Sequence, residues 1–472
     1  MKSAYFQEDR PYSKAYIAQC LNWSLEEAAQ AIGYLRSCNI VKLVNSKNIE
    51  YTEAGNPVIQ EHALQLKFDF VGVIEYKGKI IKVSPKYIKS HKEEPDVSDM
   101  RIAIKAIERY GQYQNFVINI SNEQDEQKIY NPLSIALYVI RDYFLNGIYS
   151  KTQEVLEQQG NGEIDWEATI NETFPILQNG KPYYVDYFTK QNVTEDENYF
   201  SRLHECLITL CAQKIKNAEL DTLFDIEAPL LYGGGLSDFG SPEYIKQKIL
   251  GELNTQFVTQ RQITLRAMYA ILAANEYAEN DFGVSFYGTN SFNMVWEKAC
   301  ADVFENRLDS PVCDNDTLTW RKTIKHPEWT CYEPENKFET ETLRPDVVSI
   351  FTVKGKKYFA ILDAKYYDVN KTEQGVLTGV PGVEDINKQH LYELALRENI
   401  ESQGYEVINA FIFPSHDDSN KIVGEVKMPI LFDALKLKPI KVVMLSPKFL
   451  LTHFIEQKTI LFASIFEQLI GE

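Results

Sequence analysis

A hairpin pattern around residue 355 constrains the fold of this chain more than any other feature. Two apolar runs, Pro345–Val353 and Lys356–Tyr367, are separated by Lys354–Gly355, a pair typical of a tight turn. The second run carries Asp363 and Lys365, which share one face of a strand because residues two apart do so. Ionised groups are costly in apolar surroundings unless they are paired or used. We therefore expect an antiparallel hairpin with a charged site at its end.

The acidic residues of this hairpin are of the kind that binds a divalent metal ion. Asp346 follows Arg344–Pro345 at the start of the first strand and is expected to lie beside Asp363. Phosphodiester cleavage requires Mg²⁺ on oxygen ligands, a nucleophilic water, and positive charge near the developing oxyanion. The pattern therefore predicts Mg²⁺-dependent hydrolysis (Mn²⁺ being a possible substitute). The alternative interpretation is an ordinary hairpin with an incidental Asp–Lys ion pair.

Two helices expected on either side of the hairpin add further candidates. The helix at 291–305 carries Glu297 among apolar neighbours, as a third metal ligand or as an acid that reaches solvent. The helix at 385–399 places Lys388, Gln389 and Tyr392 on one face, since residues three and four apart are helix neighbours. That face is expected to contact the scissile phosphate or to orient the lysine. The alternative is a plain polar helix face.

This constellation resembles the PD-(D/E)xK nuclease superfamily. The resemblance implies that Asp346 and Asp363 bind metal and that Lys365 orients and polarises the attacking water. It also implies that Glu297 is the acid of the first core helix and that the products are 5′-phosphate and 3′-hydroxyl ends. Asp363 stands where Glu is more frequent, a replacement that the superfamily tolerates.

Residues 1–65 read as a winged-helix-like unit. We expect one helix at 13–21, a second begun by Ser24 with Glu27 in a capping box, and a strand pair at 40–44 and 49–51. The functional interpretation is DNA recognition, and the alternative is a protein-docking module. The acids of the second helix match a phosphate backbone poorly.

A basic hairpin is expected next, turning at Lys77–Gly78. Its Lys77, Lys79 and Lys82 are candidate contacts to DNA or to an acidic partner, although a solvated hairpin face is the commoner explanation. A helix is expected at 95–114. The stretches 131–149, 205–218 and 245–276 also have helical periodicity, and residues 160–166 read as a loop entering a strand.

From residue 284 the pattern becomes α/β. Further strands are expected at 405–413 and 441–445. We therefore predict a multidomain α/β protein with a winged-helix-like unit at 1–65, a mainly helical partner-binding region with the basic hairpin at 66–283, and a PD-(D/E)xK domain at 284–472.

Charge and composition narrow the classes of function. A net charge of −18 opposes simple DNA binding, which depends on neutralising phosphates. No Gly-Lys pair precedes Ser or Thr, so the sequence has no P-loop motif. The 7 cysteines include no CxxC pair, which predicts reduced thiols in the cytoplasm. No run of apolar residues suggests a signal peptide or is long enough to span a membrane, so we expect no membrane as a partner.

Further motifs lie at residues 70–87 (FVGVIEYKGKIIKVSPKY), Gly162–Trp166, Thr169–Ile170, Asp196–Leu203 and Asp385–Gln389. With these motifs the chain resembles the McrC family and, more closely, the LlaJI-type restriction endonuclease subunit. It implies the nuclease subunit of a two-component restriction system for phage defence, which cuts double-stranded DNA. It also implies activation by a separate, hexameric McrB-like AAA+ GTPase that binds the GTP itself. The alternatives are a stand-alone endonuclease and a non-enzymatic winged-helix regulator or GTPase-stimulating adaptor.

Overall fold

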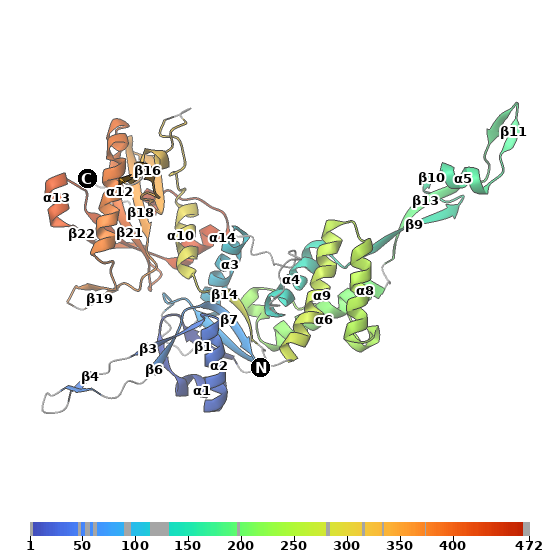
Figure 1. Cartoon of the computed structure of the whole chain (residues 1–472), viewed down its shortest axis with the longest axis horizontal. Helices are drawn as coiled ribbons and strands as arrows, with labels where there is room; N and C mark the ends of the chain where they lie inside the picture. The colour runs from blue at the N-terminus through green and yellow to red at the C-terminus, as the bar shows by residue number, and fades with distance from the viewer. Residues whose placement is uncertain are drawn as a thin grey trace. The chain divides into compact units, whose positions relative to one another are not determined.

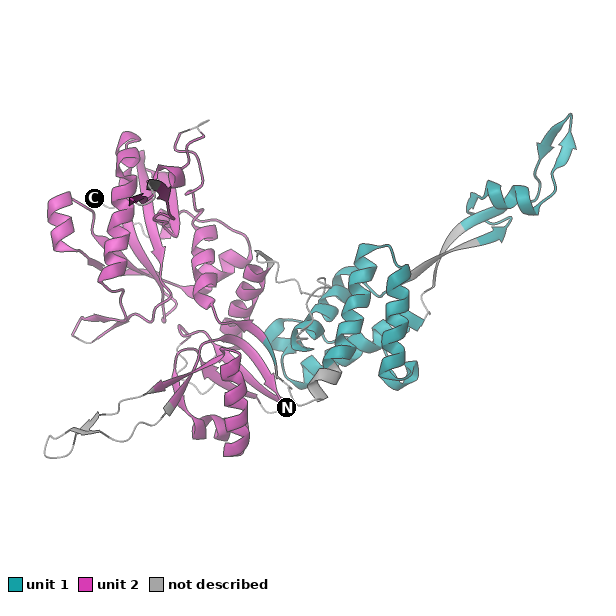
Figure 2. Ribbon diagram, viewed as in Figure 1, with its two compact units in different colours: residues 1, 119–286 teal, residues 2–118, 287–472 magenta. Residues whose placement is uncertain are grey.

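A computed structural model of the chain divides it into two compact units (Figure 2). Unit 1 comprises residues 1 and 119–286, and unit 2 comprises residues 2–118 and 287–472. Unit 2 is therefore built from two separate stretches of sequence. The boundaries predicted at residues 65 and 283 remain predictions. The structure describes residues 3–45, 49–51, 57–59, 64–88, 96–113, 132–195, 199–279, 284–313, 317–332, 335–372 and 374–465.

Unit 2 begins with two helices on a small sheet. Helix α1 (Lys14–Leu21) is capped by Ser13, and α2 (Leu25–Ser37) begins at Ser24. The predicted capping box is confirmed: Glu27 N donates to Ser24 Oγ at 3.1 Å, and Ser24 N donates to Glu27 Oε2 at 2.7 Å. Two satisfied backbone donors fix where this helix starts.

The predicted pairing of strands 40–44 and 49–51 is wrong. Strand β3 (Val41–Asn45) pairs with β6 (Leu64–Phe68), which also pairs with β2 (Pro11–Ser13). Strand β4 (Ile49–Tyr51) pairs instead with β5 (Pro57–Ile59). Strand β6 brings Leu66 and Phe68 into this pairing, both buried, so the register of β6 is set by its apolar face.

The basic hairpin is confirmed and forms part of a second sheet, of order β1-β8-β7-β14. Strands β7 (Val71–Tyr76) and β8 (Lys79–Ser84) are antiparallel, and Lys77 and Gly78 at the turn have φ of 45° and 73°. Strand β1 (Ser3–Gln7) runs parallel to β8. In β7, Gly72 lies so close to β14 (Val284–Thr289) that a Cβ at this position would be 2.2 Å from the Tyr287 carbonyl oxygen. Glycine has no Cβ and avoids this clash.

Unit 1 contains a bundle of helices and a β-rich arm. The predicted helix at 245–276 is wrong as one element: Gln256–Val258 interrupt it, and the Gln256 side chain accepts a hydrogen bond from Val258 N at 3.0 Å. The arm, residues 151–195, consists of a ribbon with a short helix and a hairpin between its strands. The bundle helices are α4 (Pro132–Asn146), α6 (Tyr199–Asn217), α7 (Asp221–Phe224), η1 (Leu236–Phe239), α8 (Pro242–Thr255) and α9 (Thr259–Glu279). The arm elements are β9 (Lys151–Gln158), β10 (Glu163–Ile164), α5 (Trp166–Glu172), β11 (Ile176–Gln178), β12 (Lys181–Tyr183) and β13 (Phe188–Glu195).

The second part of unit 2 is a five-stranded mixed sheet of order β17-β18-β21-β23-β22. Strands β18, β21 and β23 are parallel, and the two edge strands are antiparallel to their neighbours. The strands are β17 (Val347–Val353), β18 (Lys356–Ala364), β21 (Glu406–Pro414), β22 (Lys421–Val426) and β23 (Ile440–Leu445). The predicted mixed α/β arrangement is confirmed. Assignment to the winged-helix and PD-(D/E)xK classes remains a prediction.

Helices pack against this sheet and place its charged end. Helix α12 (Val383–Ser402) lies along β18 and β21, and α10 (Phe292–Val303) packs against β17 and β18 (Figure 1). Helix α10 also contacts α3 (Val97–Tyr113) and α14 (Pro447–Ile455). The short elements are α11 (Trp320–Thr323), β15 (Glu328–Tyr332), β16 (Glu335–Glu339), β19 (Asn370–Lys371), β20 (Leu377–Thr378), α13 (Pro429–Leu435) and α15 (Phe462–Ile465). Within the described ranges, no helix has the length and apolar composition to cross a bilayer.

Candidate active site

The predicted antiparallel hairpin is confirmed, and its open end brings two acids together. The turn residues Lys354 and Gly355 have positive φ, and the register runs from Val353↔Lys356 to Val347↔Leu362. One step further in that register sets Asp346 beside Asp363. Local sequence pattern alone therefore placed these carboxyl groups as neighbours.

Asp346 is a carboxyl group held in an unfavourable place for a charge. Its Oδ2 accepts a hydrogen bond from Ala364 N at 3.0 Å. Burial, and then the neighbouring Asp363 and Glu297, raise the pKa of Asp346 to about 8. Asp363 itself is 4% exposed and shares a hydrogen bond with Asp346. Asp346 is half-buried and Asp363 is buried. Two adjoining acids that resist double ionisation are typical of sites that hold a cation or a proton.

Lys365 supplies the positive charge of the site. Its Nζ lies 3.0 Å from Asp363 Oδ2 and 2.9 Å from Asp385 Oδ1. Burial lowers the pKa of Lys365, but the two carboxylates outweigh burial and leave the pKa above its ordinary value. The Lys365 backbone N–H donates to the Ile412 carbonyl at 2.9 Å, which extends the pairing of β18 with β21 by one residue. The ammonium is therefore charged, anchored and only partly open to solvent.

Glu297 reaches the same end of the sheet from α10. Its side chain is half-buried, and burial raises its pKa, with Asp363 adding to the effect and Arg344 opposing it. Among the described residues, no three carboxylate, His or Cys side chains are grouped closely enough to enclose a metal ion. The hydrogen-bonded pair of Asp346 and Asp363 is thus the preformed part of the site, and Glu297 as a ligand stays a prediction.

The predicted face of α12 divides between core and surface. Gln389 is 1% exposed and donates from Nε2 to the Ile361 carbonyl at 3.1 Å and to Asn409 Oδ1 at 2.7 Å. Tyr392 is fully buried in a core cluster with residues such as Trp320 and Phe359. Lys388 is exposed, with Nζ 5.8 Å from the Tyr392 ring centre. Gln389 and Tyr392 therefore pin α12 to the sheet, and only Lys388 of the three lies at the surface.

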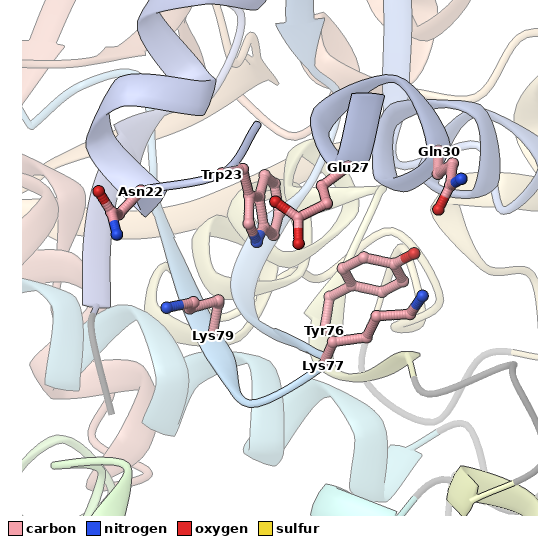
Figure 3. Close-up of a pocket in the computed structure, with 7 residues that line it drawn as sticks. All are labelled: Asn22, Trp23, Glu27, Gln30, Tyr76, Lys77 and Lys79. Carbon is pink, nitrogen blue, oxygen red and sulfur yellow. The ribbon is translucent and has the colours of Figure 1, made fainter. Parts of the chain in front are cut away.

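The basic hairpin belongs to a different sheet of unit 2 from the one that carries Asp363, and it is far from Asp363 in the sequence. Lys82 is 4% exposed, with Nζ 5.1 Å from the Tyr5 ring centre, whereas Lys77 is exposed and Lys79 half-buried. Lys77 and Lys79 line a cavity of about 150 Å³ with Trp23, Tyr76 and Glu27, and with Asn22 and Gln30 (Figure 3). The contact predicted for Lys77 and Lys79 is compatible with their positions, and it remains a prediction.

Sequence reasoning missed two contributors near the hairpin end. Asp385 was placed at a helix start and in a stretch that carries the family resemblance, but it was given no role, yet it binds Lys365. Tyr366, next to Lys365, donates from its hydroxyl to Glu8 Oε2 at 2.6 Å, and Lys86 Nζ lies 4.3 Å from its ring centre. Burial raises the pKa of Glu8. A tyrosine beside a charged strand end was the only available signal, since Glu8 is remote in sequence.

The fold and this site define a multidomain α/β protein with a two-carboxylate, one-lysine centre at the end of a hairpin. Residues 70–448 match the LlaJI restriction endonuclease family, and the chain belongs to that family. It is similar to a Bacillus subtilis (strain 168) protein, Type II restriction enzyme BsuMI component YdjA, with 28% identity over 97% of this chain and 90% of that protein.

Solved structures of Thermococcus gammatolerans McrB and McrC also resemble the chain in part. A half-complex of McrB AAA+ hexamers with bound McrC matches at a TM-score of 0.40 and 14% identity, over 96% of this chain and 99% of the matched chain. A structure of the McrBC complex matches at 0.27 and 15% identity, over 66% and 89%.

Proposed function

We propose that this chain is the DNA-cutting subunit of a two-component restriction system, with its hydrolytic centre at Asp346, Asp363 and Lys365. The observation that carries the proposal is the convergence of two hydrogen-bonded carboxyl groups, one buried and one half-buried, with one anchored ammonium in a restriction endonuclease family member. Perturbed acids beside a fixed cation are more frequent at catalytic centres than in ordinary hairpins.

The donor set fits Mg²⁺. This ion binds oxygen ligands and is usually held by one or two protein carboxylates, with water and substrate phosphate completing its shell. Asp346 and Asp363 offer that pair, and Glu297 is near enough to affect the pKa of Asp346. When bound, Mg²⁺ would lower the pKa of a coordinated water and neutralise charge on the scissile phosphate.

The chain's own residues then have distinct tasks. Asp346 and Asp363 hold the cation, and the backbone N–H of Ala364 fixes the Asp346 oxygen that it binds. Lys365 places a positive charge beside Asp363, where it would orient the attacking water and offset the negative charge that develops on phosphate oxygens. Gln389 and Tyr392 serve this centre indirectly, because they fix α12 against β18.

A partner protein would supply the DNA affinity and the GTP hydrolysis. A net charge of −18 repels phosphate at long range, and the sequence has no P-loop motif. A partner would overcome both deficits, as the resemblance to McrC-type subunits implies for an McrB-like AAA+ GTPase. The other partner is the substrate, double-stranded DNA.

The arm of unit 1 is the surface that we assign to this partner. Phe174 is 96% exposed, Leu177 72% and Ile176 59%, and Trp166 and Ile170 are each more than half exposed. Large apolar side chains gathered in this way usually mark a protein interface. The arm therefore offers an apolar docking surface that is separate in sequence from the hairpin centre.

A plasmid-cleavage assay tests the proposal. We expect weak cutting by the chain with Mg²⁺ alone, double-strand breaks when the GTPase and GTP are added, and none with EDTA. Efficient site-specific cutting by the chain alone would overturn the two-component assignment. Cutting that persists in EDTA would overturn the metal-dependent centre.

A further inference from the structure

We propose that Asp385 is a positioning residue that holds Lys365 in its working place, an inference that rests on the proposed nuclease function. Lys365 Nζ lies between two carboxylates, 3.0 Å from Asp363 Oδ2 and 2.9 Å from Asp385 Oδ1. Asp363 belongs to the candidate metal pair and Asp385 does not. Once a cation is present, the two carboxylates therefore attract Lys365 to different extents.

Asp363 cannot give the same oxygen fully to a cation and to an ammonium. When it serves as a metal ligand, its attraction for Lys365 weakens, and the lysine needs a second anchor. A lysine side chain has four rotatable bonds and loses much rotamer entropy when it is fixed, so it does not stay in place without a second anchor. Asp385 is the described carboxylate that remains within hydrogen-bonding distance of Nζ.

The position of Asp385 suits this task because its helix is fixed to the strand that carries Lys365. Asp385 lies in the first turn of α12. One turn further, Gln389 bonds the Ile361 carbonyl of β18, and Tyr392 packs in the core below. The distance between Asp385 and the end of β18 is thereby set by buried contacts, so the carboxylate is a rigid support and not a mobile surface acid.

An ordinary structural role for Asp385 predicts different behaviour. An acid in the first turn of a helix stabilises the helix through its dipole, whatever the acid contacts. Glu384 occupies the same turn, is exposed and has the same charge, which makes it a matched control. No side-chain cap at Gly382 involves Asp385. Removing either acid should lower the stability of the helix to a similar extent, whereas only removing Asp385 should release Lys365 from its position.

The experiment compares Asp385→Ala, Asp385→Asn and Glu384→Ala in the full chain, with the GTPase, GTP and Mg²⁺. We expect the single-turnover rate of DNA cleavage to fall about 10- to 100-fold in Asp385→Ala, less in Asp385→Asn, and not in Glu384→Ala. Because Asp385 acts through the lysine, adding Asp385→Ala to Lys365→Ala should reduce the residual rate little further. Additive losses would overturn the proposal.

A second readout separates positioning from metal binding. Stabilisation of the chain by Mn²⁺ without DNA, measured by thermal unfolding, should be unchanged in Asp385→Ala and lost in Asp363→Ala. Loss in Asp385→Ala would make Asp385 a ligand and overturn the positioning role. If Lys365→Ala is inactive but Asp385→Ala cleaves at the wild-type rate, only this inference fails. If Lys365→Ala cleaves normally, the proposed centre itself fails.

Discussion

Asp346→Asn should make the metal-free protein more stable while abolishing cleavage. The asparagine keeps an oxygen that can accept the hydrogen bond from Ala364 N, and its amide can donate to Asp363 as a protonated acid would. It removes only the ability to ionise. A carboxylate of a metal site destabilises the fold while the cation is absent, because its charge then has no counter-ion, and we propose that Asp346 is such a group.

The size of the gain follows from the pKa of Asp346. Raising that pKa from 3.8 to about 8 corresponds to at most about 6 kcal/mol lost at alkaline pH. Relaxation and water entry at the open end of the hairpin reduce this, so we expect about 1–3 kcal/mol. Because the folded pKa lies above the unfolded one, wild-type stability falls as pH rises from about 4 to about 8. The advantage of the variant should grow over the same range.

The assay is thermal unfolding of both proteins in EDTA at pH 5 and pH 8, repeated with Mn²⁺. We expect the variant to melt a few degrees higher at pH 8 and nearly level with wild type at pH 5, and Mn²⁺ to stabilise wild type alone. A variant that is less stable than wild type at pH 8, or a difference that does not depend on pH, would refute this account of the carboxyl pair.

Three further outcomes are expected. Changing Lys77 and Lys79 to Glu should reduce the salt dependence of DNA binding if they contact phosphate, or abolish co-purification with the GTPase if they contact protein; no change in either assay leaves a solvated face. Changing Phe174 and Leu177 of the arm to Ser should abolish co-purification without lowering the melting temperature, and unchanged co-purification would exclude the arm as the docking surface. Burial lowers the pKa of His204 from 6.5 to about 4, so the free energy of unfolding of unit 1 should fall by about 3 kcal/mol as pH falls through this range. In urea unfolding, His204→Asn should weaken this dependence of stability on pH, and the same dependence in variant and wild type would contradict the prediction.

The sequence predicted the hairpin centre because that centre is local. Asp346 and Asp363 lie on strands joined by a two-residue turn, so turn chemistry and strand alternation suffice to bring them together. The capping box at Ser24 was predictable for the same reason, since its partners are three residues apart.

What the sequence did not predict depends on long-range packing. Glu8 and Tyr366 are 358 residues apart and meet only through tertiary packing, which no local pattern reveals. The burial of Gln389 was missed because it follows from tertiary contact with Asn409 and not from helix periodicity. The half-polar edge strand β22 lacks a clear alternation and was overlooked.

The central claim is that Lys365 and its acidic neighbours cut DNA while another part of the chain engages the GTPase. The direct test measures DNA nicking and GTP turnover on the same preparations of wild type and Lys365→Ala. We expect the variant to fold, to co-purify with the GTPase and to stimulate GTP hydrolysis as wild type does, while nicking falls by about 10²–10⁴-fold. Nicking by Lys365→Ala at the wild-type rate would contradict the claim and place the active site elsewhere.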